Sequence, residues 1–253
     1  MEGWYEKYGG GGLVVIGLHT PEFAFEKVKS NVEDATKRFG LTYPIVMDND
    51  YSTWTAYGNQ YWPRKYLISG DGEIVYDHIG EGNYEETERA IQRALYELNG
   101  AEMDGSTLEP KNAVSTESNK VQSPEIYFGS SRNSNFGNGQ FGLKGVQTLQ
   151  IGHNLKIRSN YFYLEGTWNF SEEFATSKSD GKILFKYNAK NVYMVASSET
   201  GLSVTILKDG KFEKILFIKG NQLYALIEDV DYGEHTLEIN VPAGINAFTF
   251  TFG

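Results

Sequence analysis

The pair Trp62-Pro63 is the most informative motif of this chain. It precedes the apolar segment Lys65–Ser69, which a Gly-Asp-Gly turn joins to a second segment, Glu73–Ile79. Proline has no backbone N–H to donate, and an X-Pro bond is the usual place for a cis peptide. The simpler alternative is an ordinary proline that begins a strand beside a core aromatic residue. Thiol chemistry by the chain itself is excluded, because it contains no cysteine.

Two other motifs contain residue types suited to chemistry. His19 and Glu22 could form an acid–base pair at the end of a strand, although we favour a strand-to-helix connection there. Asp48, Asn49 and Asp50 could bind calcium through oxygen ligands, although a turn and a helix cap explain them more simply. The four histidines have no metal-ligand spacing, so we predict neither a metal site nor a cofactor.

Composition narrows the classes of partner. A chain of 253 residues with 40% hydrophobic residues is long enough for two domains with ordinary cores. The net charge of −10 argues against nucleic acid or an anionic membrane as a partner, since both require a basic face. No apolar run approaches the roughly 20 residues that span a bilayer, and the N-terminus has no apolar stretch of signal-peptide type.

Helices and strands alternate in residues 1–100, which predicts an α/β domain. The apolar run 13–18 is typical of a buried parallel strand, and helical spacing follows it. Asp50 is predicted to cap a short helix that contains Trp54 and Tyr57. Glu85, Glu86 and Glu88 are assigned to a solvated helix face. In chain order we expect a strand at 13–18, a helix at 28–39, a strand at 44–47, a helix at 50–58, a hairpin at 65–79 and a helix at 83–100.

The pattern changes near residue 100. Residues 101–123 lack periodicity and are rich in polar residues, which predicts a linker. After Pro124 the apolar residues recur with a period of two, and Asp209-Gly210 is a strong signal for a tight turn. Residues 124–253 are therefore predicted to be an all-β sandwich of jelly-roll type. Its strands are expected at 146–151, 161–168, 182–187, 192–196, 202–207, 212–218, 222–227, 235–241 and 247–252.

Five stretches, namely 12–27, 48–51, the Trp-Pro hairpin, 80–82 and 124–129, together resemble one family. Residues 1–99 resemble the thioredoxin-like domain of the TlpA/DipZ group of disulfide oxidoreductases, in particular its DipZ branch. Residues 124–253 resemble the β-sandwich of that branch, which is similar to carbohydrate-binding modules. The resemblance implies a thiol–disulfide oxidoreductase of cytochrome c biogenesis type that acts in cell redox homeostasis.

The resemblance also implies that this chain starts after the family's redox motif. In the family a strand leads into Cys-x-x-Cys, and the helix that follows ends in residues like Trp4–Tyr8. We therefore expect an incomplete thioredoxin-like domain that lacks the strand between 13–18 and 65–69 and is redox-inactive by itself. We also expect this half either to borrow a strand or to be unstable. The parent protein is expected to be extracytoplasmic or membrane-associated, with any membrane contact through an upstream region.

The residues that would contact the substrate, as the resemblance implies, can be assigned one by one. Pro63 is expected to be cis, and Trp62 with Tyr61 is expected to receive an extended peptide of a protein thiol or disulfide substrate. No catalytic residue is expected within the chain.

The alternative is a non-enzymatic module that binds a glycan or a protein, built on a thioredoxin remnant. Sugar-binding sites use exposed aromatic rings, with polar side chains that reach the hydroxyl groups. For each such residue we favour the simpler explanation that strand aromatics form the core and Asn-Gly loops form turns. The candidates for glycan binding are Arg132, Asn133, Phe136 and Trp168.

Overall fold

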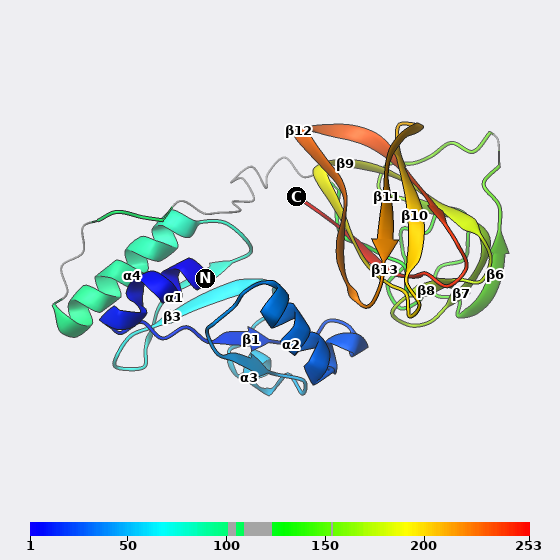
Figure 1. Cartoon of the computed structure of the whole chain (residues 1–253). Coiled ribbons are helices and arrows are strands. Elements are labelled where there is room, and N and C mark those ends of the chain that lie inside the picture. The colour runs from blue at the N-terminus through cyan, green and yellow to red at the C-terminus, as the bar shows by residue number, and fades with distance from the viewer. Residues whose placement is uncertain (101–104, 109–122, 153) are drawn as a thin grey trace. The chain divides into compact units, whose positions relative to one another are not determined.

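The computed structural model describes residues 1–100, 105–108, 123–152 and 154–253. The chain divides into two compact units, Met1–Thr116 and Glu117–Gly253 (Figure 1). The predicted linker 101–123 lies mostly outside the described residues. No helix in the described ranges combines the length and the apolar character needed to cross a membrane.

The first unit alternates helices and strands, as the sequence predicts. Two 3₁₀ turns, Gly9–Gly11 and Ala24–Lys27, interrupt the alternation. The structure also has a short helix at the N-terminus. Its elements are α1 (Glu2–Tyr8), β1 (Gly17–His19), α2 (Lys29–Arg38), β2 (Ile45–Met47), α3 (Ser52–Ala56), β3 (Arg64–Ile68), β4 (Ile74–Ile79) and α4 (Tyr84–Asn99).

These strands form two separate pairs. β1 runs parallel to β2, with Gly17 opposite Ile45, whereas β3 runs antiparallel to β4. A Cβ atom on Gly17 would lie 2.5 Å from Ile45 Cδ1, so a larger residue there would require the Ile45 side chain to move. Within the described residues, β1 and β3 do not pair with each other, and each keeps one open edge.

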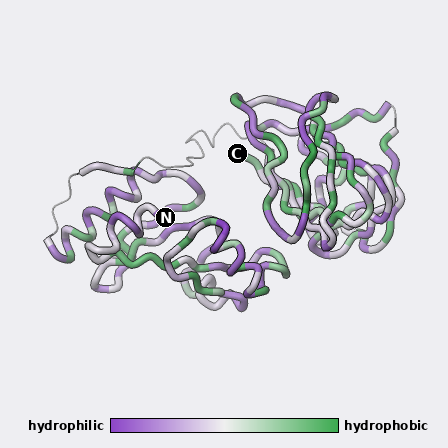
Figure 2. The backbone as a smooth tube through the Cα atoms, in the orientation of Figure 1, coloured by the Kyte–Doolittle hydropathy of each residue, from purple (hydrophilic) through white to green (hydrophobic). Residues whose placement is uncertain are grey.

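The core of the first unit is small. Trp4, Tyr8, Ile91 and Leu95 form one buried cluster where α1 meets α4. The predicted buried strand 13–18 is formed only in part: β1 begins at Gly17, and the side chains of 14, 16 and 18 are exposed. The aliphatic residues of the exposed face are Val14 (74% exposed), Ile16 (60%), Leu18 (42%) and, beside Leu18 on β2, Val46 (47%). Hydrophobic residues are drawn green in Figure 2.

The second unit is all-β. Its strands are joined in one sheet of order β11-β10-β12-β9-β13-β8-β7-β6, with β5 beside β13 and a further pairing of β9 with β7. The strands are β5 (Ile126–Tyr127), β6 (Gly145–Leu149), β7 (Phe162–Phe170), β8 (Ala175–Ser177), β9 (Gly181–Ser197), β10 (Leu202–Lys208), β11 (Lys211–Ile218), β12 (Gln222–Val241) and β13 (Asn246–Phe252).

Two long strands differ from the prediction. The predicted strands 182–187 and 192–196 are one strand, β9, and 222–227 with 235–241 are one strand, β12. The β9–β12 pairing shifts register between Glu228 and Gly233, and such bulges bend a strand without ending it. The sheet therefore folds over one core and makes a β-sandwich, while the jelly-roll connectivity stays a prediction. The predicted tight turn is present, with positive φ at Asp209 (52°) and Gly210 (74°).

Aromatic rings fill the core of this sandwich. Trp168 is fully buried and donates its Nε1–H to the carbonyl of Glu165 at 3.0 Å. The Phe136 and Phe162 rings stack with centroids 4.8 Å apart, and the rings of Phe128 and Phe250 lie close by in the same cluster. The second unit therefore has a far larger core than the first.

Candidate functional site

The chain that leads into β3 is exposed. Tyr61 and Trp62 have 48% and 53% of their surface exposed. The Trp62–Pro63 peptide bond is cis, which confirms that prediction. The motif singled out in the sequence is therefore on the surface.

The Trp62 indole is held on two sides although half of it is exposed. Its ring packs on the Trp54 ring of α3, with centroids 4.2 Å apart and planes at 33°. Its Nε1–H donates to the carbonyl of Thr20 at 3.2 Å. These contacts make the exposed face of the ring a fixed apolar surface.

A buried carboxylate positions α3 and hence Trp54. Asp48 accepts hydrogen bonds from the backbone N–H groups of Thr53 and Trp54, both at 2.9 Å. The Thr20 and Ser52 hydroxyls donate to it as well, at 3.3 and 3.2 Å. Burial raises the pKa of Asp48, but these hydrogen bonds outweigh it and bring the pKa below its ordinary value.

The acidic triplet is a helix cap rather than a ligand set. Asp48 accepts from the N–H groups of Thr53 and Trp54 in the first turn of α3. The predicted cap, Asp50, accepts from Ser52, the first residue of α3, through its backbone N–H at 3.2 Å and its hydroxyl at 2.9 Å. The Asn49 amide instead donates to the carbonyl of Lys27 at 3.1 Å. Asp48 and Asp50 therefore bond to the start of α3 while Asn49 bonds elsewhere, as the turn-and-cap explanation describes.

The backbone around Trp62 is open on one side. The carbonyl of Pro63 accepts from Gly80 N–H at 2.8 Å, on the β4 side. Asn59 holds Tyr61 by its backbone, donating to the Tyr61 carbonyl at 3.1 Å. Within the described residues, the backbone N–H and C=O of Trp62 have no hydrogen-bond partner. A donor and an acceptor therefore lie free beside a fixed indole.

A second aromatic contact lies at the C-terminal end of α3. The Tyr57 ring, just after α3, meets the Tyr66 ring of β3 edge to face, with centroids 5.0 Å apart. Tyr57 is 40% exposed. We call the exposed residues Tyr57, Tyr61 and Trp62 the aromatic ledge.

His19 and Glu22 belong to the strand-to-helix connection. The His19 ring lies 3.0 Å from the carbonyl of Glu26, through Nε2. The Glu26 carboxylate accepts from the backbone N–H groups of Glu22 and Phe23, at 2.6 and 3.2 Å. Burial raises the pKa of Glu26. Glu26 was missed in the sequence because it looks like any polar residue of a loop.

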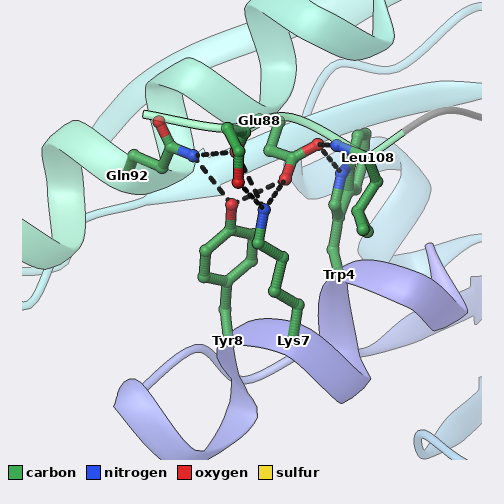
Figure 3. A network of polar contacts seen from close by, with 7 residues as sticks. Trp4, Lys7, Tyr8, Glu88, Gln92 and Leu108 are labelled. Carbon is green, nitrogen blue, oxygen red and sulfur yellow. Dashed lines mark hydrogen bonds and ion pairs between the residues drawn. The ribbon is translucent and has the colours of Figure 1, made fainter. Parts of the chain in front are cut away.

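A buried carboxylate in α4 joins α1 to the chain that follows α4 (Figure 3). Glu88 is 1% exposed and accepts from Trp4 Nε1 at 3.0 Å and Tyr8 Oη at 2.6 Å. It also accepts from Lys7 Nζ at 3.0 Å and from the backbone N–H of Leu108 at 2.8 Å.

The prediction that Glu88 lies on a solvated face is wrong. Its spacing from Tyr84, Ile91 and Leu95 on one helix stripe was the available signal.

The glycan candidates are mostly internal. Asn133 and Trp168 are fully buried and Phe136 is 7% exposed, which fits the core explanation favoured for each. Asn133 accepts from the backbone N–H of Gly142 at 3.0 Å. Arg132 is exposed, with its guanidinium 3.7 Å from the centroid of the Tyr127 ring. The structure does not bring these four residues together as a surface site.

An α/β unit with an exposed Trp-Pro loop, followed by an all-β unit, defines a thioredoxin-like protein of two parts. A family model described as "Thioredoxin like C-terminal domain" matches residues 123–253, and the chain belongs to this family. It is DipZ-like: "Protein DipZ" of Mycobacterium tuberculosis is 35% identical over 99% of this chain and 36% of that protein. The chain thus spans about a third of the length of this relative.

Other matches cover less of the chain. "Thiol-disulfide oxidoreductase ResA" of Halalkalibacterium halodurans is 34% identical over 32% of this chain and 43% of that protein. Among solved structures, a family two carbohydrate esterase from Clostridium thermocellum in complex with cellohexaose is 17% identical. It covers 36% of this chain and 31% of that chain with a TM-score of 0.34, which carries no functional argument.

Proposed function

We propose that residues 1–100 are the substrate-holding part of a thiol–disulfide oxidoreductase. The substrate is an extended segment of a protein that carries thiols or a disulfide, of the kind handled in cytochrome c biogenesis. The longer protein is extracytoplasmic or membrane-associated. The observation that supports this proposal is the free N–H and C=O of Trp62 beside its fixed, half-exposed indole. An extended peptide offers the complementary acceptor and donor.

In this proposal the chain's own residues bind and orient the substrate segment, and they do not exchange electrons with it. Thiol–disulfide exchange needs a thiolate that attacks one sulfur of a disulfide and releases the other sulfur as a thiolate. The 253 residues contain no sulfur in thiol form. The attacking and resolving thiols must therefore come from residues other than these.

We expect the purified chain to be redox-inactive. In an insulin-reduction assay with dithiothreitol, the rate should equal that of dithiothreitol alone, because the chain has no thiol to relay electrons. Turnover above that background, retained after contaminating oxidoreductases are removed, would contradict this prediction.

A binding experiment tests separately whether the chain holds an extended peptide at Trp62. Reduced and alkylated insulin B chain is an extended polypeptide that cannot exchange disulfides. We expect it to shift the NMR signals of Trp62 Nε1–H and of the backbone N–H of Trp62, while the signals of the all-β unit stay in place. Unchanged Trp62 signals at millimolar peptide would refute the proposed function.

We do not extend the proposal to glycan binding. Stacking on a sugar requires an exposed ring, and both aromatic candidates, Phe136 and Trp168, are buried.

A further inference from the structure

The sheet of the second unit ends in an apolar strand. β11 pairs only with β10 within the described residues, so its other edge is open. Phe212, Ile215 and Phe217 on this strand are 64%, 65% and 57% exposed. A long apolar edge strand pairs readily with another chain unless charges, prolines or bulges protect it. The register shift in β11 falls between Phe212 and Lys214, so residues 214–218 present a regular edge.

The exposed apolar side chains lie on the edge strand alone. Ile215 and Phe217 alternate with Leu216, which packs on the core, so these two side chains share the outer face of the sheet. Their partners on β10 are Thr205 and Ser203, which are polar. The outer face is therefore apolar at its edge and polar beside the edge. Such a stripe suits a contact across the edge, where it meets a second stripe.

The stripe is ordered before any partner binds. The Phe217 ring lies over Gly201, where an added Cβ atom would be 2.4 Å from Phe217 Cζ. The turn after β11 is held by the buried Tyr224, whose hydroxyl accepts from the backbone N–H of Lys219 at 2.8 Å and donates to its carbonyl at 2.7 Å. A surface that is ordered before binding loses little conformational entropy when a partner covers it.

Two copies of β11 complement each other when they pair antiparallel about a two-fold axis. An axis perpendicular to the sheet preserves both faces, so each side chain lies opposite one from the same face. When Leu216 lies opposite Leu216 of the second copy, Ile215 lies opposite Phe217. The same register brings Glu213 to Lys219 at both ends of the paired segment. Both are exposed, and within the described residues neither side chain makes an ion pair.

We propose that a second copy of this chain pairs antiparallel with the open edge of β11 and joins the two sandwiches into one continuous sheet. The apolar stripes meet across the edge, and two ion pairs between Glu213 and Lys219 fix the register. A second copy is the occupant because the two-fold axis satisfies both ion pairs and both Ile215–Phe217 contacts at once. The inference concerns the all-β unit and is independent of the proposed function.

Sedimentation equilibrium of the full chain measures this association. We expect a reversible dimer with a dissociation constant between about 1 µM and 1 mM, because a contact between two strand edges is a small interface. Ile215→Lys should weaken the dimer more than about 10-fold, since it replaces an apolar contact by a charge. Val146→Lys is the matched control. Val146 is 66% exposed on β6, the other end strand of the sheet, and its replacement should leave the dissociation constant unchanged.

Charge reversal tests the register. Glu213→Lys alone and Lys219→Glu alone each turn two attractions into two repulsions, so each should weaken the dimer about 10-fold. The double variant Glu213→Lys/Lys219→Glu should regain the wild-type dissociation constant. In a mixture of the two single variants, opposite charges meet again at both ends of the paired segment. Native mass spectrometry should therefore find mixed dimers in excess over either homodimer.

The outcomes that would overturn the proposal are distinct. A chain that stays monomeric at about 1 mM would contradict it directly. A dimer that Ile215→Lys leaves unchanged, or that Val146→Lys weakens equally, would use another surface, such as the open edges of the first unit. If the single charge reversals weaken the dimer but neither the double variant nor the mixture restores it, the paired register is wrong.

Discussion

Glu88→Ala will lower the free energy of unfolding of the first unit by about 3–5 kcal/mol, as expected when two or three buried hydrogen-bond donors lose their acceptor. The substitution leaves the Trp4 indole N–H, the Tyr8 hydroxyl and the Leu108 N–H without their acceptor. A buried donor without a partner costs about 1–3 kcal/mol. We expect α1 to detach from α4 and the segment 105–108 to lose its anchor.

Glu85→Ala is the control for this prediction. Glu85 lies one turn earlier on α4 and pairs with Arg89 at 2.7 Å, but both side chains are more than half exposed. Removing such a pair costs about 0.3–0.5 kcal/mol. Hydrogen exchange at the amides of α4 gives the stability of the first unit, and the strands of the all-β unit provide an internal reference. Equal protection of α4 in Glu88→Ala and Glu85→Ala would show that Glu88 does not stabilise this unit.

The same carboxylate should make the first unit sensitive to acid. Burial raises the pKa of Glu88, but hydrogen bonds from Tyr8, Leu108, Lys7 and Trp4 outweigh it and bring the pKa below its ordinary value. A folded-state pKa below the unfolded one stabilises the fold at pH values above the unfolded pKa. This contribution is lost as the pH falls through the folded pKa. Lowering the pH should therefore reduce the free energy of unfolding of the first unit more in the wild type than in Glu88→Ala.

Amides of 13–18 and 65–69 will exchange with solvent roughly 100-fold faster than those of the central sandwich strands, given the range of local stabilities within proteins. β1 and β3 each have an open edge in the described part of the chain. The face with Val14, Ile16 and Leu18 is also exposed, so little apolar burial opposes opening. Strands of the second unit, such as β9, lie between two partners over a large core.

The prediction of fast exchange at 13–18 and 65–69 is tested by hydrogen exchange on a sample shown to be monomeric. β9 is the internal reference, because it is measured in the same sample. Equal protection of 13–18, 65–69 and β9 would refute the inference that these edges lack a strand. Protection that rises with protein concentration would instead show that a second copy covers the edges.

Local patterns determined much of the fold. The helix α4 (Tyr84–Asn99), the hairpin around Gly-Asp-Gly and the Asp209-Gly210 turn were all predicted, because helical period, turn chemistry and positive φ depend on residues close together in the sequence. The cis bond at Pro63 followed from the family resemblance. The absence of thiol chemistry followed from composition alone.

Strand continuity was decided by the tertiary structure. The residues around 188–191 and 228–233 have turn-like composition, and the sequence predicted breaks there. In the structure the chain continues through both, because neighbouring strands in the sheet satisfy the backbone on either side of the bulge. A bulge is a property of a pair of strands, so it is not visible in either strand alone.

The roles of single polar residues also depended on the tertiary structure. Glu88 and Glu85 have the same side chain on the same helix, yet one is buried beneath α1 and the other is solvated. Likewise, Asp50 accepts from the first N–H of α3 as predicted, but Asp48, placed after β2, accepts from the next two N–H groups, which the sequence did not indicate. Local sequence determined which elements form and which chemistry is excluded. The partners of a carboxylate or an indole come from residues distant in the chain, so only the packing of α1, α3 and α4 decided which of them form the Glu88 network and the aromatic ledge.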